Sequence, residues 1–312
     1  MSKTAKIKAV RLCSEAVNFM VLLAVLLLLA FGGYAMWDSK QVYRAAAPTH
    51  YGIYKPTAES GDLSFQELRA INPEVFAWLT VYGTDIDYPI AQGPDNMKYI
   101  NTNAKGQYSL SGAIFLDSGS PQDFSGFPSI LYGHHMEKNA MFSEIGLFAE
   151  KSYFDAHRYG RIYFGGREHG LEFFAFVRAD AYDGAVFRTN IAGQKARQAY
   201  LELLLSKAPH TRRVQVTAGD KIVLLSTCSA SATNGRDILA AKLTDEIYKD
   251  PFRSDETGKK GNGLAVDRLP GLWARIPLWL RIAVLALPPL LLLAVLLAKK
   301  IRSRHKEMIR HA

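Results

Sequence analysis

The sequence has 312 residues and a formal net charge of +9, which suggests a nucleic acid or another anionic partner. The excess charge is confined to two short tails: residues 1–11 carry four cations, and residues 299–312 carry six cations and Glu307. The long segment between the tails is neutral overall, which removes the main support for nucleic-acid binding.

An uncharged apolar run, residues 16–37, follows the first basic tail. It contains VLLAVLLLLAF and is long enough to cross a hydrocarbon core of about 30 Å at roughly 1.5 Å per residue. A cleaved signal peptide is the alternative, because three alanines follow at 45–47, but the run exceeds an ordinary signal-peptide core. We therefore expect a cytoplasmic tail over 1–15 and a transmembrane helix over 16–37.

The next segments predict a stalk and then two short helices. Residues 38–61 lack clear periodicity and are expected to form an extracellular stalk before a folded domain over 62–249. Ser64 and Glu67 have the spacing of a capping box and predict a helix over FQELRAI. Asn72-Pro73 predicts a second short helix over PEVFAWL.

The rest of this domain predicts strands. Seven segments are short, apolar or alternating, and bounded by turn residues: GAIFLD, PSILYG, RIYF, LEFFAFVRA, RRVQV, KIVLLST and DILAAKL. In GQKARQAYLELLLSK the apolar residues Ala196, Tyr200, Leu203 and Leu204 recur with helical period, which predicts a helix shortly before KIVLLST. The pattern favours an all-β barrel or sandwich with helical insertions.

A second membrane segment is expected near the C-terminus. Residues 250–275 are polar and rich in glycine and proline, as in a linker, and 276–298 contain a 17-residue apolar run from Ile282 to Ala298. Pro288-Pro289 is tolerable in a membrane helix. Because each basic tail abuts an apolar run, we expect both termini, including the tail over 299–312, to be cytoplasmic and residues 38–275 to be outside.

Cys228 ends the run KIVLLSTC and is the single cysteine between the two apolar runs. An unpaired thiol outside the cytosol is a candidate nucleophile, and it needs groups that favour the thiolate, hold an oxyanion and protonate the leaving group. Arg236, at the start of the next strand, offers a permanent cation, although it could equally be a surface residue that caps a strand. His134 and His135 end SILYG, and strand alternation lets only one of them face a given thiol. No metal-ligand spacing and no phosphate-binding glycine loop occurs, so we expect neither a metal nor a cofactor.

These motifs resemble those of a known family. LSTC, the arginine that opens RDILAAKL, and the upstream LYGHHMEKNAMF are similar to the active-site motifs of class B sortases. The resemblance extends through INPEVFAWLTVYGTDIDYPI, DNMKYI and SGAIFLD and covers about residues 62–247. It implies a mainly β fold on the surface of a Gram-positive bacterium. The expected fold is an eight-stranded sortase barrel with N-terminal helices and a helical insertion before the cysteine strand, flanked here by two transmembrane helices.

The resemblance also implies a function. Cys228 would cleave a C-terminal sorting motif of secreted proteins after threonine and transfer the acyl group to an amine of a cell-wall precursor or a pilin. His134, which directly follows Gly133, and Arg236 would complete the catalytic site. The second membrane segment departs from class B and is more usual in class C, but the aromatic lid triplet of class C is missing from residues 38–61.

Two other functions stay open at this point. A cell-wall cysteine peptidase or amidase is one, but it normally places its cysteine at a helix start and before the histidine in sequence. A non-catalytic, membrane-tethered surface domain is the other, in which Cys228 is a small core residue.

Overall fold

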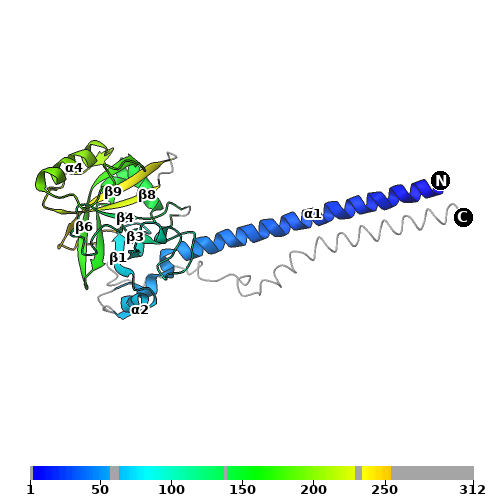
Figure 1. Ribbon diagram of the computed structural model, residues 1–312, viewed down its shortest axis with the longest axis horizontal. Coiled ribbons are helices and arrows are strands. Elements are labelled where there is room, and N and C mark those ends of the chain that lie inside the picture. Colours follow the sequence, from blue (N-terminus) through cyan, green and yellow to red (C-terminus); the bar gives the residue numbers. More distant parts are fainter. Residues whose placement is uncertain (1–2, 57–62, 137–138, 229–233, 254–312) are drawn as a thin grey trace, which may run out of the picture. The chain divides into compact units, whose positions relative to one another are not determined.

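A computed structural model describes residues 3–56, 63–136, 139–228 and 234–253. These ranges contain the helix α1 and all the strands that are labelled in Figure 1. The second predicted membrane helix, over 276–298, the basic tail after it and most of the linker before it lie outside the described residues. The two-helix topology therefore stays a prediction.

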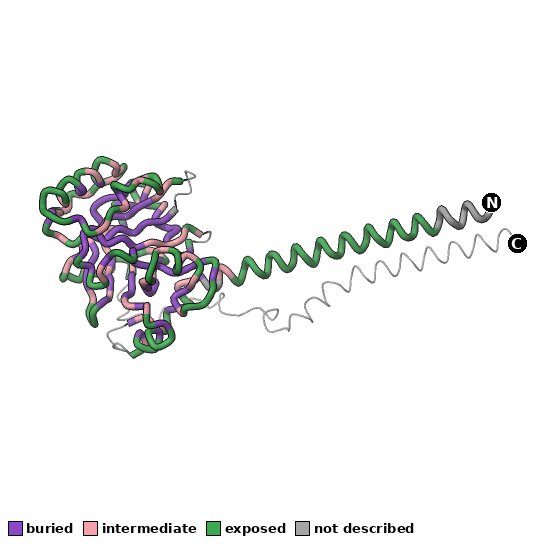
Figure 2. The backbone as a smooth tube through the Cα atoms, viewed as in Figure 1, coloured by how far each residue is buried: buried purple, intermediate pink, exposed green. Residues whose placement is uncertain are grey.

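The helix α1, Lys3–Ala46, contains the first predicted membrane segment. Its stretch Leu12–Tyr43 is long and apolar enough to span a membrane, and residues 12–41 are exposed (Figure 2). The same length and composition would also suit a signal sequence. The helix continues through 38–46, the start of the expected stalk, and ends just before Pro48, which disfavours helical geometry in the residue that precedes it.

The end of α1 is fixed to the folded domain. Ala46 is buried, and its carbonyl accepts a hydrogen bond from the Tyr88 hydroxyl at 2.9 Å. The same hydroxyl accepts a hydrogen bond from the Met141 backbone N–H at 3.0 Å. Two short 3₁₀ turns, η1 (Pro48–His50) and η2 (Gly52–Tyr54), then carry the chain along the domain surface.

Among the described residues, nine strands form one sheet in the order β5-β1-β2-β3-β4-β8-β9-β6-β7. A further pairing of β5 with β6 closes eight of these strands into a barrel, and β7 extends the outer edge of β6. The predicted eight-stranded barrel is thus observed. The strands are β1 (Val75–Val81), β2 (Asp87–Ala91), β3 (Ile114–Leu116), β4 (Ser129–Tyr132), β5 (Tyr159–Phe164), β6 (Arg167–Asp180), β7 (His210–Thr211), β8 (Lys221–Cys228) and β9 (Gly235–Thr244).

Helices fill the connections between the strands. The first, α2 (Leu63–Ile71), confirms the helix predicted over FQELRAI, and α4 (Gln194–Ser206) confirms the helix predicted before β8. The others are η3 (Lys98–Ile100), η4 (Ser143–Ala149) and α3 (Lys151–Ala156).

Successive side chains of β8 and β9 point to opposite faces of the sheet and so contribute to two separate apolar cores. Val223 and Leu225 lie in the barrel interior, whereas Ile222 and Leu224 lie in a second cluster with the buried face of α4. Each face of these two strands is therefore covered, which explains why KIVLLST reads as a continuous apolar run.

Two local predictions are wrong. PEVFAWL is not a helix, because β1 begins at Val75 and pairs with β2 and β5. The Asn72 side chain accepts a hydrogen bond from the Glu74 N–H at 3.2 Å and so forms a turn instead of a helix cap.

RRVQV is not a strand either. The ladder ends at Thr211, and the Val214 N–H bonds to the Arg212 carbonyl only two residues back, at 2.8 Å. This tight turn removes the segment from the sheet, while Val214 and Val216 pack against the α4 cluster.

Candidate active site

The backbone of β8 and β9 brings Cys228 and Arg236 together. Cys228 is the last residue of β8, and its register partner on β9 is Arg236. Directly opposite residues of an antiparallel pair share a face of the sheet, with Cβ atoms about 5 Å apart. The Cys228 side chain itself lies outside the described residues.

His134 follows the neighbouring strand β4, which runs parallel to β8. Tyr132 is the register partner of Ser226, and the Gly133 N–H continues the ladder by donating to the Ser226 carbonyl at 3.1 Å. His134 is the next residue after this bond, and Cys228 lies two residues after Ser226 on β8. The ends of β4 and β8 and the start of β9 therefore meet where sequence analysis predicted a site.

The two adjacent histidines differ in their surroundings. His134 is half-buried, and its Nε2 lies 2.8 Å from the Ile100 carbonyl oxygen. His135 is exposed, and its backbone forms an isolated bridge with Met141. Of the two rings, the His134 ring is the one enclosed by the structure.

The electrostatics at the end of β4 involve Arg236. Burial, with Asp117 nearby, raises the pKa of the Tyr132 phenol, and the cation of Arg236 opposes this shift. The half-buried guanidinium thus acts on the residue two positions before His134. This position suits a cation that stabilises a developing negative charge near the strand ends.

A polar cluster beside Tyr132 was not identified as a site from the sequence. Asp117 is buried and accepts hydrogen bonds through Oδ2 from the Asn96 amide at 2.7 Å and from the Tyr132 hydroxyl at 3.3 Å. The Ser118 N–H in turn donates to Asn96 Oδ1 at 2.7 Å. The segments DNMKYI and SGAIFLD belong to the family resemblance, but their spacing in the sequence does not indicate that Asn96 and Asp117 meet. The cluster holds the hydroxyl of Tyr132, which lies two residues before His134 in the chain.

Two cavities lined by described residues lie elsewhere on the barrel. A cavity of about 330 Å³ is lined in part by Lys221, the first residue of β8, and it shares Phe164 and Gly165 with a neighbouring cavity of about 410 Å³. Cys228 lies seven positions after Lys221 on the same strand, which corresponds to about 23 Å at the usual rise per residue. These cavities are therefore not the candidate site, whose chemistry is defined by the strand ends.

The described residues contain no group of three or more His, Cys, Asp or Glu side chains that could hold a metal ion. The described part of the site offers two groups near the end of β8: the imidazole of His134 and the guanidinium of Arg236. This set is suited to thiol-based acyl transfer.

No protein-family model matches the chain. Sortase B of Listeria monocytogenes is 30% identical over 210 residues, covering 66% of this chain and 82% of that relative. The crystal structure of sortase B from the Type II pilus of Streptococcus pneumoniae is 44% identical, with a TM-score of 0.52, and the match covers 58% of this chain and 99% of that one. The Staphylococcus aureus sortase B-substrate complex is 28% identical, with a TM-score of 0.55, over 59% of this chain and 85% of that one. Each relative is matched over most of its own length.

Proposed function

Because this chain belongs to the class B sortases, which are cysteine transpeptidases, we propose that Cys228, His134 and Arg236 carry its chemistry. The observation that supports the proposal is the pairing of Cys228 with Arg236 at the end of β8, next to the end of β4, which His134 follows by two residues. The pairing of Cys228 with Arg236 is a feature of this chain's own sheet and supports the proposal separately from the family membership.

The proposed reaction has two acyl transfers. The Cys228 sulfur attacks the carbonyl of a threonine in a C-terminal sorting motif, the C–N bond breaks, and the departing amine takes a proton from His134. Arg236 and backbone N–H groups stabilise the oxyanion of each tetrahedral intermediate. An incoming amine then loses its proton to His134 and attacks the thioester, which releases the Cys228 thiolate. Transfer exceeds hydrolysis only if the amine is held in better position than water.

The acceptor is an amine of a pilin or of a cell-wall precursor. Of the three relatives described above, the one with the highest identity comes from a pilus, which favours a pilin lysine. Parallel reactions with a lysine-containing pilin peptide and with a cell-wall precursor amine would test this proposal. Faster transfer to the precursor amine would reject the pilin acceptor.

The enzyme is proposed to act at the outer face of the membrane. The apolar stretch of α1 and the second apolar run in the sequence support two membrane anchors with both termini in the cytoplasm. The partners are then secreted proteins that carry a sorting motif, and not nucleic acids.

The roles of Cys228 as the nucleophile and of Arg236 as the cation that stabilises the oxyanion are tested together, with the full chain in detergent. The substrate is a synthetic peptide that spans the threonine of a C-terminal sorting motif from a secreted protein of the same organism. Cys228→Ala is expected to abolish the thioester adduct in mass spectra and all transfer to an added amine. Arg236→Lys keeps the charge but loses the planar fork, so kcat should fall about 100-fold, as for a lost oxyanion donor, while a small thiol reagent still labels Cys228. Near-normal transfer by Cys228→Ala would reject the proposed site.

A further inference from the structure

The hydrogen bond of His134 defines which ring nitrogen carries the proton. Nε2 lies 2.8 Å from the Ile100 carbonyl oxygen, and a carbonyl only accepts hydrogen bonds. Nε2 must therefore be protonated. A neutral imidazole carries one proton, so its Nδ1 is then an acceptor, and no hydrogen bond from the described residues reaches it.

The carbonyl that makes this bond belongs to η3, and the residue before it is fixed in the core. Tyr99 is fully buried, and its hydroxyl donates to Glu74 Oε2 at 2.6 Å and accepts from Asn72 Nδ2 at 2.9 Å. Burial, with a contribution from Glu74, raises the pKa of Tyr99, so the hydroxyl remains a donor.

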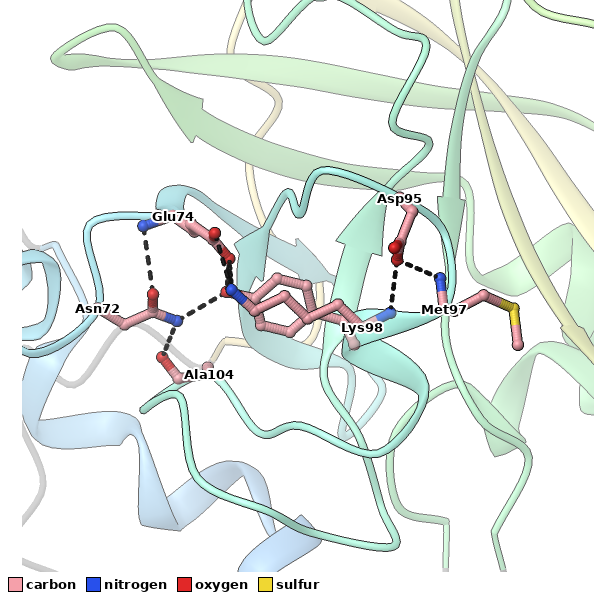
Figure 3. Close-up of polar contacts among 7 residues, drawn as sticks. Asn72, Glu74, Asp95, Met97, Lys98 and Ala104 are labelled. Atoms are coloured by element: carbon pink, nitrogen blue, oxygen red, sulfur yellow. Dashed lines mark hydrogen bonds and ion pairs between the residues drawn. The ribbon is translucent and has the colours of Figure 1, made fainter.

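Further bonds fix the two sides of this segment (Figure 3). The Asp95 carboxylate accepts from the N–H groups of Met97 and Lys98, both at 2.9 Å, at the start of the turn. The Asn72 amide also donates to the Ala104 carbonyl at 3.1 Å. The short segment that carries the Ile100 carbonyl is thus tied down before and after it.

Gly112 leaves room for this carbonyl. It has a φ of +59°, and a Cβ at this position would lie 2.6 Å from the Ile100 oxygen and 2.4 Å from the Tyr99 oxygen. Both contacts are too short for a real side chain. The returning chain also bonds here, because the Ala113 N–H donates to the Tyr99 carbonyl at 3.0 Å. The Ile100 carbonyl is therefore confined between a bare backbone and the His134 ring.

We propose that the Ile100 carbonyl, positioned by Tyr99 and Gly112, holds His134 in its Nε2–H tautomer and so assigns Nδ1 to proton transfer. This inference rests on the catalytic role proposed for His134. Nδ1 takes the proton of the Cys228 thiol as the S–H bond breaks, and later gives it to the departing amine. While His134 is an imidazolium, its Nε2–H bond to the carbonyl becomes charge-assisted and stronger. The carbonyl thus orients the ring and stabilises its charged state, and Tyr99 and Gly112 are positioning residues.

The test uses the full chain in detergent, labelled with ¹⁵N in its histidine rings. NMR distinguishes a protonated from an unprotonated ring nitrogen, and the spectrum of a His134→Ala sample identifies the signals of His134. Wild type is expected to show a protonated Nε2 and an unprotonated Nδ1 when the ring is neutral. Tyr99→Phe keeps the ring but loses both hydroxyl bonds, so it should mix the tautomers and lower kcat by about 10- to 100-fold with little change in KM, as expected for a displaced catalytic group.

Tyr108→Phe is the matched control, because Tyr108 lies in the same connection between η3 and β3 but its side chain is 77% exposed. It should leave both the tautomer and kcat unchanged. Gly112→Ala is a second, stronger displacement of the carbonyl and should have the same effects as Tyr99→Phe, with folding checked by circular dichroism. A protonated Nδ1 in the wild type, or an unchanged tautomer and kcat in Tyr99→Phe, would overturn the inference. If instead His134→Ala is fully active, the catalytic role of His134 fails while the tautomer result still stands, so the two failures are distinguishable.

Discussion

Replacing each of the two adjacent histidines in turn tests the register at the end of β4. His134→Ala removes the proposed general acid, which typically contributes about 100- to 10,000-fold in rate. At about 1.36 kcal/mol per tenfold, this corresponds to a barrier increase of about 2.7 to 5.4 kcal/mol. His135 is exposed, and its bridge to Met141 uses backbone atoms that alanine retains. The cost of His135→Ala should therefore stay within about 0.5 kcal/mol, or a little more than twofold.

The loss in His134→Ala should come from chemistry and not from unfolding. The hydrogen bond to the Ile100 carbonyl contributes about 0.5 to 1.5 kcal/mol to stability, a small part of the roughly 5 to 15 kcal/mol of a typical domain. Initial rates with one peptide and one amine give kcat/KM, and thermal unfolding of each variant reports its fold. An inactive His135→Ala with a nearly normal His134→Ala would refute the register and require a site built around His135.

Two further predictions concern stability and topology. Burial raises the pKa of Glu144 above its ordinary value of 4.5, with the Asp85 carboxylate adding to the shift and the Asp85 N–H bond opposing it. A raised folded pKa gives stability that is present below the unfolded pKa and lost as the pH rises through the folded pKa. Glu144→Gln keeps the acceptor but not the charge, so urea unfolding should find it similar to wild type at about pH 4 and more stable at about pH 7; equal stability at both would contradict this reasoning. Protease added to intact protoplasts should digest the central domain and spare tags at both termini, whereas loss of a C-terminal tag would reject the second membrane span.

The strands of the barrel were predictable from the sequence where the apolar pattern of a single segment is enough to identify it. KIVLLST and DILAAKL are apolar on both faces because the barrel interior and α4 cover them, so their runs are visible in sequence. The helix prediction for PEVFAWL is wrong because this segment becomes a strand through its pairing with β2 and β5, and because the Asn72 turn resembles a helix cap in sequence. RRVQV alternates like a strand, yet the turn at Val214 depends on long-range packing that the local pattern does not contain.

The candidate site divides in the same way. The sequence indicates Cys228, Arg236 and His134 because each lies at or next to the end of a predicted strand and in a family motif. The Ile100 carbonyl escaped prediction because a backbone oxygen has no residue type to recognise, and its partner His134 lies 34 positions away. Asn96 and Asp117 are similar: each looks like an ordinary turn residue until the fold brings their side chains to 2.7 Å.

The hydroxyl of Tyr88 links the end of α1 to the segment that follows His134. It bonds on one side to the Ala46 carbonyl and on the other to the Met141 N–H, and the next residue, Phe142, donates its N–H to the His134 carbonyl at 3.0 Å. A truncated protein that begins after Ala46 lacks the first of these bonds, although it keeps Cys228, His134 and Arg236. We therefore expect the segment after His134 to be less constrained in such a truncation than in the full chain, and the truncation to turn over more slowly. Truncations meant for kinetics should therefore begin within the last turns of α1.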